Sequence, residues 1–128
     1  MIYLDSSVLL AYLLDEDRAP PESLWKEPLT SSRLLQYETW NRLHASGRGP
    51  SHGDDARRLI DRVDLLELTP EVLARALEPF HVQVRTLDAL HLASIAFLRE
   101  RGQRAELATY DVRFAGAARA LGVPLLNL

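Results

Sequence analysis

Short apolar segments alternate with longer helical segments along this chain, and this alternation constrains the fold more than any other feature. We expect strands at residues 2–4, 28–30, 65–68, 106–109 and 124–126. These segments are so short and apolar that both faces of the sheet they form must be covered. The pattern therefore predicts an α/β fold, a three-layer α/β/α sandwich with a short-stranded, mostly parallel central sheet.

Helix start and stop signals fit between the predicted strands. Thr69 before Pro70 has the order of an N-cap and a first helical residue, and Gly102 and Gly122 are placed to end helices. We expect helices at residues 6–14, 32–45, 70–78, 87–101 and 112–121, and a further helix that contains Leu59, Ile60 and Val63.

Composition excludes several classes of site. The length of 128 residues suits one domain, which we place at residues 1–128. The absence of cysteine excludes disulfides, thiolate zinc sites and cysteine nucleophiles. A net charge of −3 gives no overall attraction to nucleic acid. No segment has the form of a signal peptide or a membrane span, so we expect a cytoplasmic protein with no membrane partner.

Four acidic residues stand where an isolated carboxylate is unfavourable, namely Asp5, Glu38, Asp88 and Asp111. Asp5 and Asp111 follow apolar strands, and ligands of parallel α/β sheets bind beyond the carboxyl ends of the strands. Asp88 lies in the apolar segment 87–93 with no counter-charge beside it. Two carboxylates ~4 Å apart repel by roughly 4 kcal/mol at an effective dielectric of ~20. Mg²⁺ prefers oxygen ligands and would reverse that repulsion, so a metal site is the hypothesis.

Each acid also has an ordinary structural interpretation. Asp5 and Asp111 each precede a predicted helix, and Asp is a favoured N-cap residue. Asp88 falls in the first turn of its helix, where the macrodipole favours negative charge. Glu38 precedes Arg42 by four residues, which is the spacing of a surface ion pair. Capping and surface pairing therefore remain open alternatives.

Two other polar residue types near these acids have weaker signals. His91 follows Asp88 by one helical turn, so it could supply a metal nitrogen ligand, but a histidine packed on a helix face is the commoner outcome. Ser6 and Ser7 lack the context of a nucleophile elbow. A hydroxyl beside Asp5 is better suited to orienting that carboxylate or a metal-bound water.

Four segments resemble, in order, the acidic motifs of the PIN-domain nucleases. Residues 2–7 resemble the opening strand with its Asp-Ser, and residues 32–38 are similar to the helix that carries the glutamate. Residues 85–93 look like the third acidic motif, and residues 109–124 look like the fourth. The resemblance extends over nearly the whole chain, and the segment around Asp88 is its most specific part.

Within that family, a single domain of this size most resembles the VapC toxins of toxin–antitoxin pairs. The resemblance implies an endoribonuclease that depends on Mg²⁺ or Mn²⁺ and hydrolyses RNA phosphodiester bonds. It also implies a cognate VapB-like antitoxin over the active site, and a homodimer. Carried over motif by motif, it assigns both catalysis and metal binding to four residues, Asp5, Glu38, Asp88 and Asp111.

Three alternatives remain, two of which belong to other functional classes. A phosphoacceptor signalling domain needs paired acids at the first strand and a lysine near the last, whereas Asp5 has no acidic neighbour and Lys26 is the only lysine. A partner-binding PIN module without turnover would have no reason to keep four repelling acids. A PIN-domain nuclease of RNA processing is the nearest competitor, although a chain of this length leaves no room for an appended domain.

Overall fold

Four parallel strands form the centre of the computed structural model, which describes all 128 residues. Their order in the sheet is β3-β2-β1-β4. The strands are β1 (Ile2–Leu4), β2 (Leu29–Ser32), β3 (Val63–Leu66) and β4 (Glu106–Ala108). The predicted last strand is reduced to an isolated parallel bridge between Leu107 and Leu125. The α/β fold class is confirmed.

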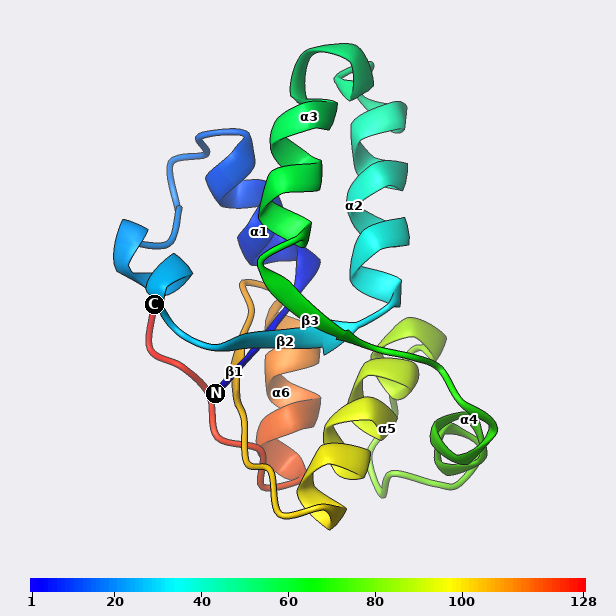
Figure 1. The fold of residues 1–128 in the computed structure, drawn as a ribbon. Helices are drawn as coiled ribbons and strands as arrows, with labels where there is room; N and C mark the ends of the chain where they lie inside the picture. Colours follow the sequence, from blue (N-terminus) through cyan, green and yellow to red (C-terminus); the bar gives the residue numbers. More distant parts are fainter.

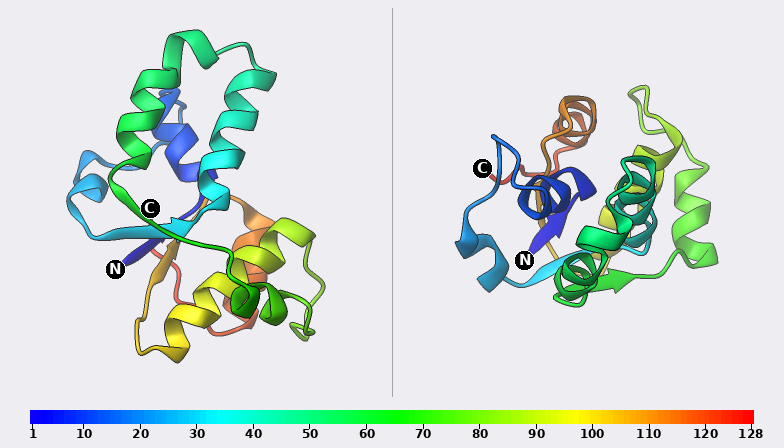
Figure 2. Two further views of the ribbon diagram at one scale, coloured as in Figure 1. Left: turned by 45° about the vertical axis from the view of Figure 1, so that its right-hand side comes forward. Right: turned by 90° about the horizontal axis from the view of Figure 1, so that it is seen from above.

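Helices cover both faces of this sheet. They are α1 (Ser6–Leu13), a 3₁₀ helix η1 (Glu22–Lys26), α2 (Leu34–Ala45), α3 (Gly49–Ile60), α4 (Pro70–Ala76), α5 (Thr86–Glu100) and α6 (Val112–Ala120). Helices α1, α2 and α3 lie on one side, and α4, α5 and α6 lie on the other (Figures 1 and 2). No helix combines the length and apolar character needed to cross a membrane.

Strand β1 divides its side chains between two hydrophobic cores, because successive residues of a strand point to opposite faces. Ile2 and Leu4 are buried in the core beneath α1 and α2. Tyr3 is fully buried in the other core, which is formed by α4, α5 and α6. This alternation directs the Tyr3 hydroxyl toward α5, where it contributes to the site described below.

Several element boundaries differ by one or two residues from the sequence prediction, and two of the differences have a clear local cause. Val63 belongs to β3, where it pairs with Leu29, and not to the preceding helix. The buried residues of α3 include Ala56 and Ile60, so Val63 continues the same helical spacing, and periodicity alone could not exclude it. Helix α5 begins at Thr86, one residue before the predicted start at residue 87, and Arg85 occupies the N-cap position without a side-chain cap bond.

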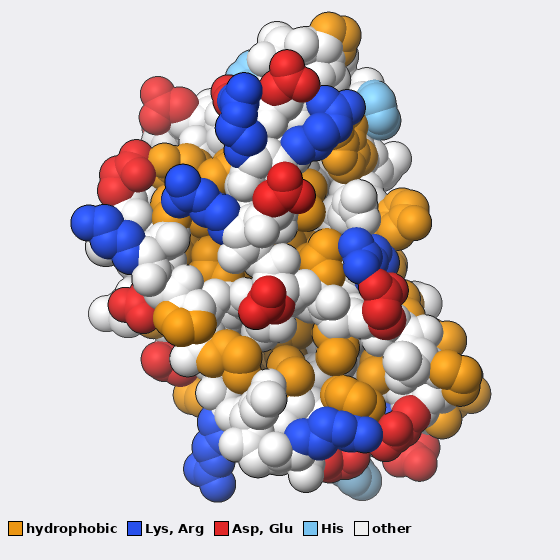
Figure 3. All heavy atoms as spheres, viewed as in Figure 1, with side chains coloured by type: hydrophobic (Ala, Val, Ile, Leu, Met, Phe, Trp, Pro, Cys, Tyr) orange, Lys and Arg blue, Asp and Glu red, His pale blue; other side chains and the backbone are white.

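The starts of α1, α4 and α6 agree with the sequence prediction. The Thr69 hydroxyl accepts a hydrogen bond from the Val72 N–H at 3.3 Å, as its position before Pro70 predicted. Acidic and basic side chains are interspersed on the face shown in Figure 3, without a large area of one sign.

Candidate active site

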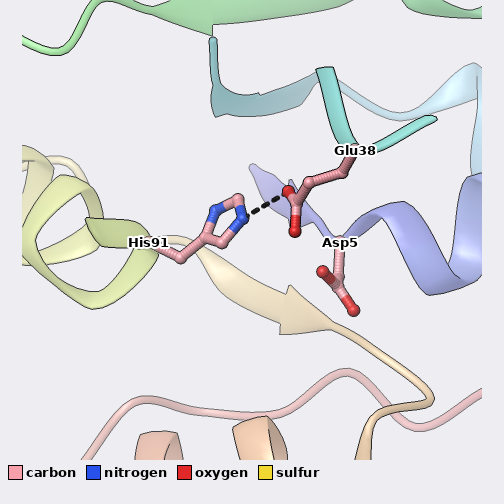
Figure 4. A group of neighbouring side chains, drawn as sticks. All are labelled: Asp5, Glu38 and His91. Atoms are coloured by element: carbon pink, nitrogen blue, oxygen red, sulfur yellow. Dashed lines mark hydrogen bonds and ion pairs between the residues drawn. The ribbon is translucent and has the colours of Figure 1, made fainter. Parts of the chain in front are cut away.

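Asp5 and Asp111 both follow strands at the same edge of the sheet. Asp5 comes directly after β1, and its N–H donates to the Ala108 carbonyl of β4 at 3.0 Å. Glu38 reaches this edge from α2, and His91 reaches it from α5. Figure 4 shows the side chains of Asp5, Glu38 and His91 converging from these three elements. One ligand atom from each of these three residues lies within 4.8 Å of the others.

Asp5 is buried, and its side chain does not cap α1. Its Oδ2 instead accepts hydrogen bonds from Ser7 Oγ at 2.6 Å and Thr109 Oγ1 at 2.7 Å. Burial raises the pKa of the Asp5 carboxyl, and these two bonds offset part of that increase. The expected role of a hydroxyl beside Asp5 is thus found at Ser7. Asp5 Oδ1 has no hydrogen-bond donor from the protein.

Glu38 is held by a histidine and not by the arginine one turn along its own helix. Its Oε1 lies 2.7 Å from His91 Nε2, and Tyr3 donates or accepts at the other ring nitrogen, with its hydroxyl 2.8 Å from Nδ1. No ion pair forms between Glu38 and Arg42. His91 is buried, as the packed alternative expected, but it is also engaged on both nitrogens.

Arg85 bridges the two remaining acids. Its Nε and Nη2 donate to Asp88 Oδ2 at 3.1 and 3.0 Å, and its Nη2 also donates to Asp111 Oδ2 at 2.8 Å. The expectation that Asp88 lacks a local counter-charge was therefore wrong. Arg85 lies three residues before Asp88, which at a helix start is close enough for direct contact.

Asp111 acts as a helix cap, in agreement with its ordinary interpretation. Its Oδ1 accepts from the N–H groups of Arg113 at 2.9 Å and Phe114 at 3.2 Å. Partial burial would raise the pKa of Asp111, but the α6 backbone bonds and the Arg85 guanidinium outweigh burial and lower it. Capping occupies Oδ1 only, so Oδ2 faces the site, where it accepts from Arg85.

Thr109 connects the two groups of acids. Its hydroxyl donates to Asp5 Oδ2 and accepts from the Asp111 N–H at 3.0 Å. Asp88 and His91 are also three residues apart on α5, so their side chains share one face of that helix. Thr109 and Tyr3 carry no sequence signal of a site residue, although each is placed by a strand that was predicted.

Thr109→Val is expected to lower the free energy of unfolding by about 1–2 kcal/mol, because it removes a donor to Asp5 and an acceptor for a backbone N–H. Thr39→Val is the matched control. The Thr39 hydroxyl is buried without a partner, so its removal should be neutral or stabilising. Urea denaturation of the three proteins measures the difference, and equal effects of the two substitutions would refute the bridging role of Thr109.

The donor set is suited to a hard divalent cation. Asp5 and Glu38 each keep one carboxylate oxygen without a protein donor, and Figure 4 shows the second Glu38 oxygen on the side of Asp5. The two acids oppose each other's ionisation, since the charge of the half-buried Glu38 raises the pKa of the buried Asp5 further. Oxygen ligands and uncompensated negative charge are what Mg²⁺ and Mn²⁺ bind.

Comparisons with known proteins agree on one family. Residues 2–120 match the PIN domain family. The chain is 30% identical over 129 residues to ribonuclease VapC47 of Mycobacterium tuberculosis, an alignment that covers 95% of this chain and 93% of that protein. It is 35% identical over 130 residues to ribonuclease VapC46 of the same species, covering 98% and 95%.

Solved structures share the fold at lower sequence identity. A toxin–antitoxin complex from Klebsiella pneumoniae superposes with a TM-score of 0.68 at 18% identity, covering 91% of this chain and 92% of that one. M. tuberculosis VapC20, described as a toxin that cleaves the sarcin–ricin loop, superposes with a TM-score of 0.59 at 18% identity, covering 91% and 95%. The chain therefore belongs to the PIN-domain family, and within it to the VapC ribonucleases.

Proposed function

We propose that this protein is a divalent-metal-dependent endoribonuclease that hydrolyses phosphodiester bonds of RNA, and that it is the toxin of a type II toxin–antitoxin pair. The observation that carries the proposal is the convergence of the buried Asp5 and the half-buried Glu38, from separate elements, beside the Arg85-bridged pair. The relatives named ribonuclease VapC align with almost the entire chain, which supports the same activity here.

Mg²⁺ or Mn²⁺ is the proposed cofactor, held by Asp5, Glu38, Asp88 and Asp111. Such an ion, when bound, stabilises negative charge on the phosphate and lowers the pKa of a bound water. Ser7 and Thr109 hold the Asp5 carboxylate in place, so the protein supplies an ordered oxygen ligand before the ion arrives. That order lowers the entropic penalty of binding.

Arg85 is the proposed phosphate-binding residue. Its side chain is half exposed, so it can exchange Asp88 and Asp111 for an RNA phosphate, which a guanidinium binds through paired hydrogen bonds. In the metal-free protein Arg85 neutralises the same carboxylates that a cation needs. Metal and guanidinium therefore compete for Asp88 and Asp111.

Arg85→Gln is expected to tighten Mn²⁺ binding about tenfold, because the competing charge-assisted hydrogen bonds are lost. The same change should raise KM for RNA, because a phosphate contact is lost. Calorimetric titration and steady-state cleavage measure the two effects. Arg58→Gln breaks another (i, i+3) ion pair at an exposed position and should change neither. Unchanged or weaker Mn²⁺ binding by Arg85→Gln would contradict the competition.

The proposed macromolecular partners are RNA and a VapB-like antitoxin, with a homodimer as the proposed assembly in the cytoplasm. A groove lined by Leu34, Tyr37, Trp40 and Leu87 lies beside Glu38, and Tyr37 and Leu87 are exposed there. An exposed apolar groove next to the acids suits an antitoxin segment that covers the site. The toxin–antitoxin complex of similar fold supports this assignment.

The test of the activity is cleavage of a structured RNA by the purified protein with Mn²⁺, with excess chelator, and with chelator followed by added Mn²⁺. The proposal expects cleavage only in the first and third conditions. Cleavage that survives complete metal removal would contradict a metal-dependent mechanism. Growth arrest on expression, relieved by a co-expressed antitoxin, separates a toxin from a nuclease of RNA processing.

A further inference from the structure

We propose that His91 and Tyr3 are a buried positioning pair that holds Glu38 in the orientation needed to bind a divalent cation, and that His91 itself is not a metal ligand. This inference rests on the proposed function, because it gives two further residues a role in the same site. Both side chains are almost completely buried, so neither is placed to touch substrate. Both act through the carboxylate of Glu38.

His91 is fixed in place by contacts on every side. Its side chain and that of Tyr3 are almost completely buried. The Tyr3 ring meets the imidazole edge-on, with centroids 5.8 Å apart and planes at 87°, and the Phe114 ring lies 5.5 Å away. The ring therefore has little freedom to rotate, and it connects β1, α5 and α2 through a single row of hydrogen bonds.

Both ring nitrogens already have partners, which decides between a ligand role and a positioning role. An ionised Glu38 carboxylate can only accept, so His91 Nε2 must carry the proton of the 2.7 Å bond. Burial raises the pKa of the Tyr3 phenol well above its ordinary range, so its hydroxyl keeps its proton and can donate to Nδ1. An imidazole in this state has no lone pair left for a cation.

As a result, the Glu38 carboxylate has one oxygen held by His91 and one oxygen without a protein partner. Oε1 is tied to His91, and Figure 4 shows the other oxygen directed to the side where Asp5 lies. A glutamate with a freely rotating side chain loses side-chain entropy when it is ordered. The His91 bond orders this side chain in advance. Groups that orient metal ligands in this manner typically change affinity or activity by about 10–100-fold when they are replaced.

The proton position can be measured without any activity. Long-range ¹H–¹⁵N correlation spectra of the metal-free wild-type protein should show the His91 proton on Nε2, in a single state. Tyr3→Phe removes only the hydroxyl and should allow a mixture of tautomers. A wild-type His91 with an unprotonated Nε2 would overturn the proposal, because such a ring cannot donate to Glu38.

Two substitutions of His91 distinguish the role of Nε2 from the role of Nδ1. The amide nitrogen of His91→Gln can take the place of Nε2, whereas the amide of His91→Asn reaches only the place of Nδ1. In Mn²⁺ calorimetry we expect His91→Asn to bind about 10–100-fold more weakly and His91→Gln to stay close to wild type. His52→Asn, a change of the same type at a surface position, should have no effect. Equal weakening by Gln and Asn would indicate packing alone and would overturn the proposal.

A double-mutant cycle with Glu38→Gln identifies the residue through which His91 acts. If His91 works by orienting Glu38, then His91→Asn should cost little additional Mn²⁺ affinity once Glu38 is already Gln. Additive losses would contradict that pathway. The cycle uses variants whose thermal unfolding is measured in parallel, and Tyr3→Phe provides the milder change if His91→Asn fails to fold.

Failure of this inference can be distinguished from failure of the proposed function. If wild-type protein neither binds Mn²⁺ nor cleaves RNA, both fall together. If the wild type binds and cleaves while His91→Asn binds Mn²⁺ equally well, only the positioning role falls. Weakened binding by Asn with rescue by Gln supports both.

Discussion

Asp5→Asn is expected to lower RNA cleavage by about 10³-fold while raising the Tm of the metal-free protein by roughly 2–5 °C. Charge stabilisation by a metal contributes several kcal/mol, and each 1.36 kcal/mol is a factor of about ten in rate. The Asn oxygen can still accept from Ser7 and Thr109, so the geometry is kept while the buried charge is removed. Steady-state kinetics and thermal unfolding with chelator measure the two effects.

The pH dependence of stability gives the same substitution a second readout. Because burial raises the folded-state pKa of Asp5 above its unfolded value, the folded state holds its proton more tightly. Stability is therefore lost as pH rises from the unfolded value through the raised pKa, and Asp5→Asn should abolish that loss. Asp111 has a lowered pKa, so its contribution is present above the unfolded value and is lost as pH falls.

The loss of stability at low pH that is due to Asp111 should remain in the Asp5→Asn protein. It therefore serves as an internal control for the loss that the substitution abolishes. Denaturant unfolding across the acidic range resolves both slopes. If the Asp5→Asn protein lost cleavage but was less stable than wild type at neutral pH, the description of Asp5 as a destabilising buried charge would be contradicted.

Asp88→Asn is expected to lower cleavage to a similar degree, about 10³-fold, but to have the opposite effect on stability. Asp88 is paired with Arg85 and lies in the first turn of α5, where a negative charge is favoured. Its neutralisation removes both interactions, so the Tm of the metal-free protein should fall by roughly 2–4 °C. Loss of activity with opposite changes in Tm distinguishes Asp88 from Asp5.

Asp55→Asn is the control for Asp88, because Asp55 also pairs with an arginine three residues away but at an exposed position. It should retain full cleavage and nearly unchanged stability. If Asp88→Asn raised the Tm as Asp5→Asn does, Arg85 would not be the counter-charge of Asp88 in solution.

The fold could be predicted from local patterns because each element has its own signals. Thr69-Pro70 and Asp111 start helices, and the apolar segment after Met1 forms the central strand β1. Boundaries failed where two periods coincide. Val63 continues the helical spacing of α3, and it is equally suited to pair with Leu29 in the sheet. Only the pairing in the folded protein decides that Val63 belongs to the strand.

The candidate site could be predicted only in part, because its counter-charges are set by contacts across the fold. The sequence motifs identified the four acids, whose roles remain proposals. They did not indicate that Arg85 would neutralise Asp88 and Asp111 together, since that contact joins residues 26 positions apart. Nor could they place Tyr3 against His91, which are separated by 88 positions and meet only when β1 and α5 pack.

A crystal soaked in Mn²⁺ and measured at a wavelength where manganese scatters anomalously tests the central claim most directly. The account predicts an anomalous peak at about 2.0–2.2 Å from the carboxylate oxygens of Asp5 and Glu38, with His91 Nε2 still bonded to Glu38 and outside the coordination shell. A crystal that binds Mn²⁺ only elsewhere, or that shows no peak between these two carboxylates, would contradict it.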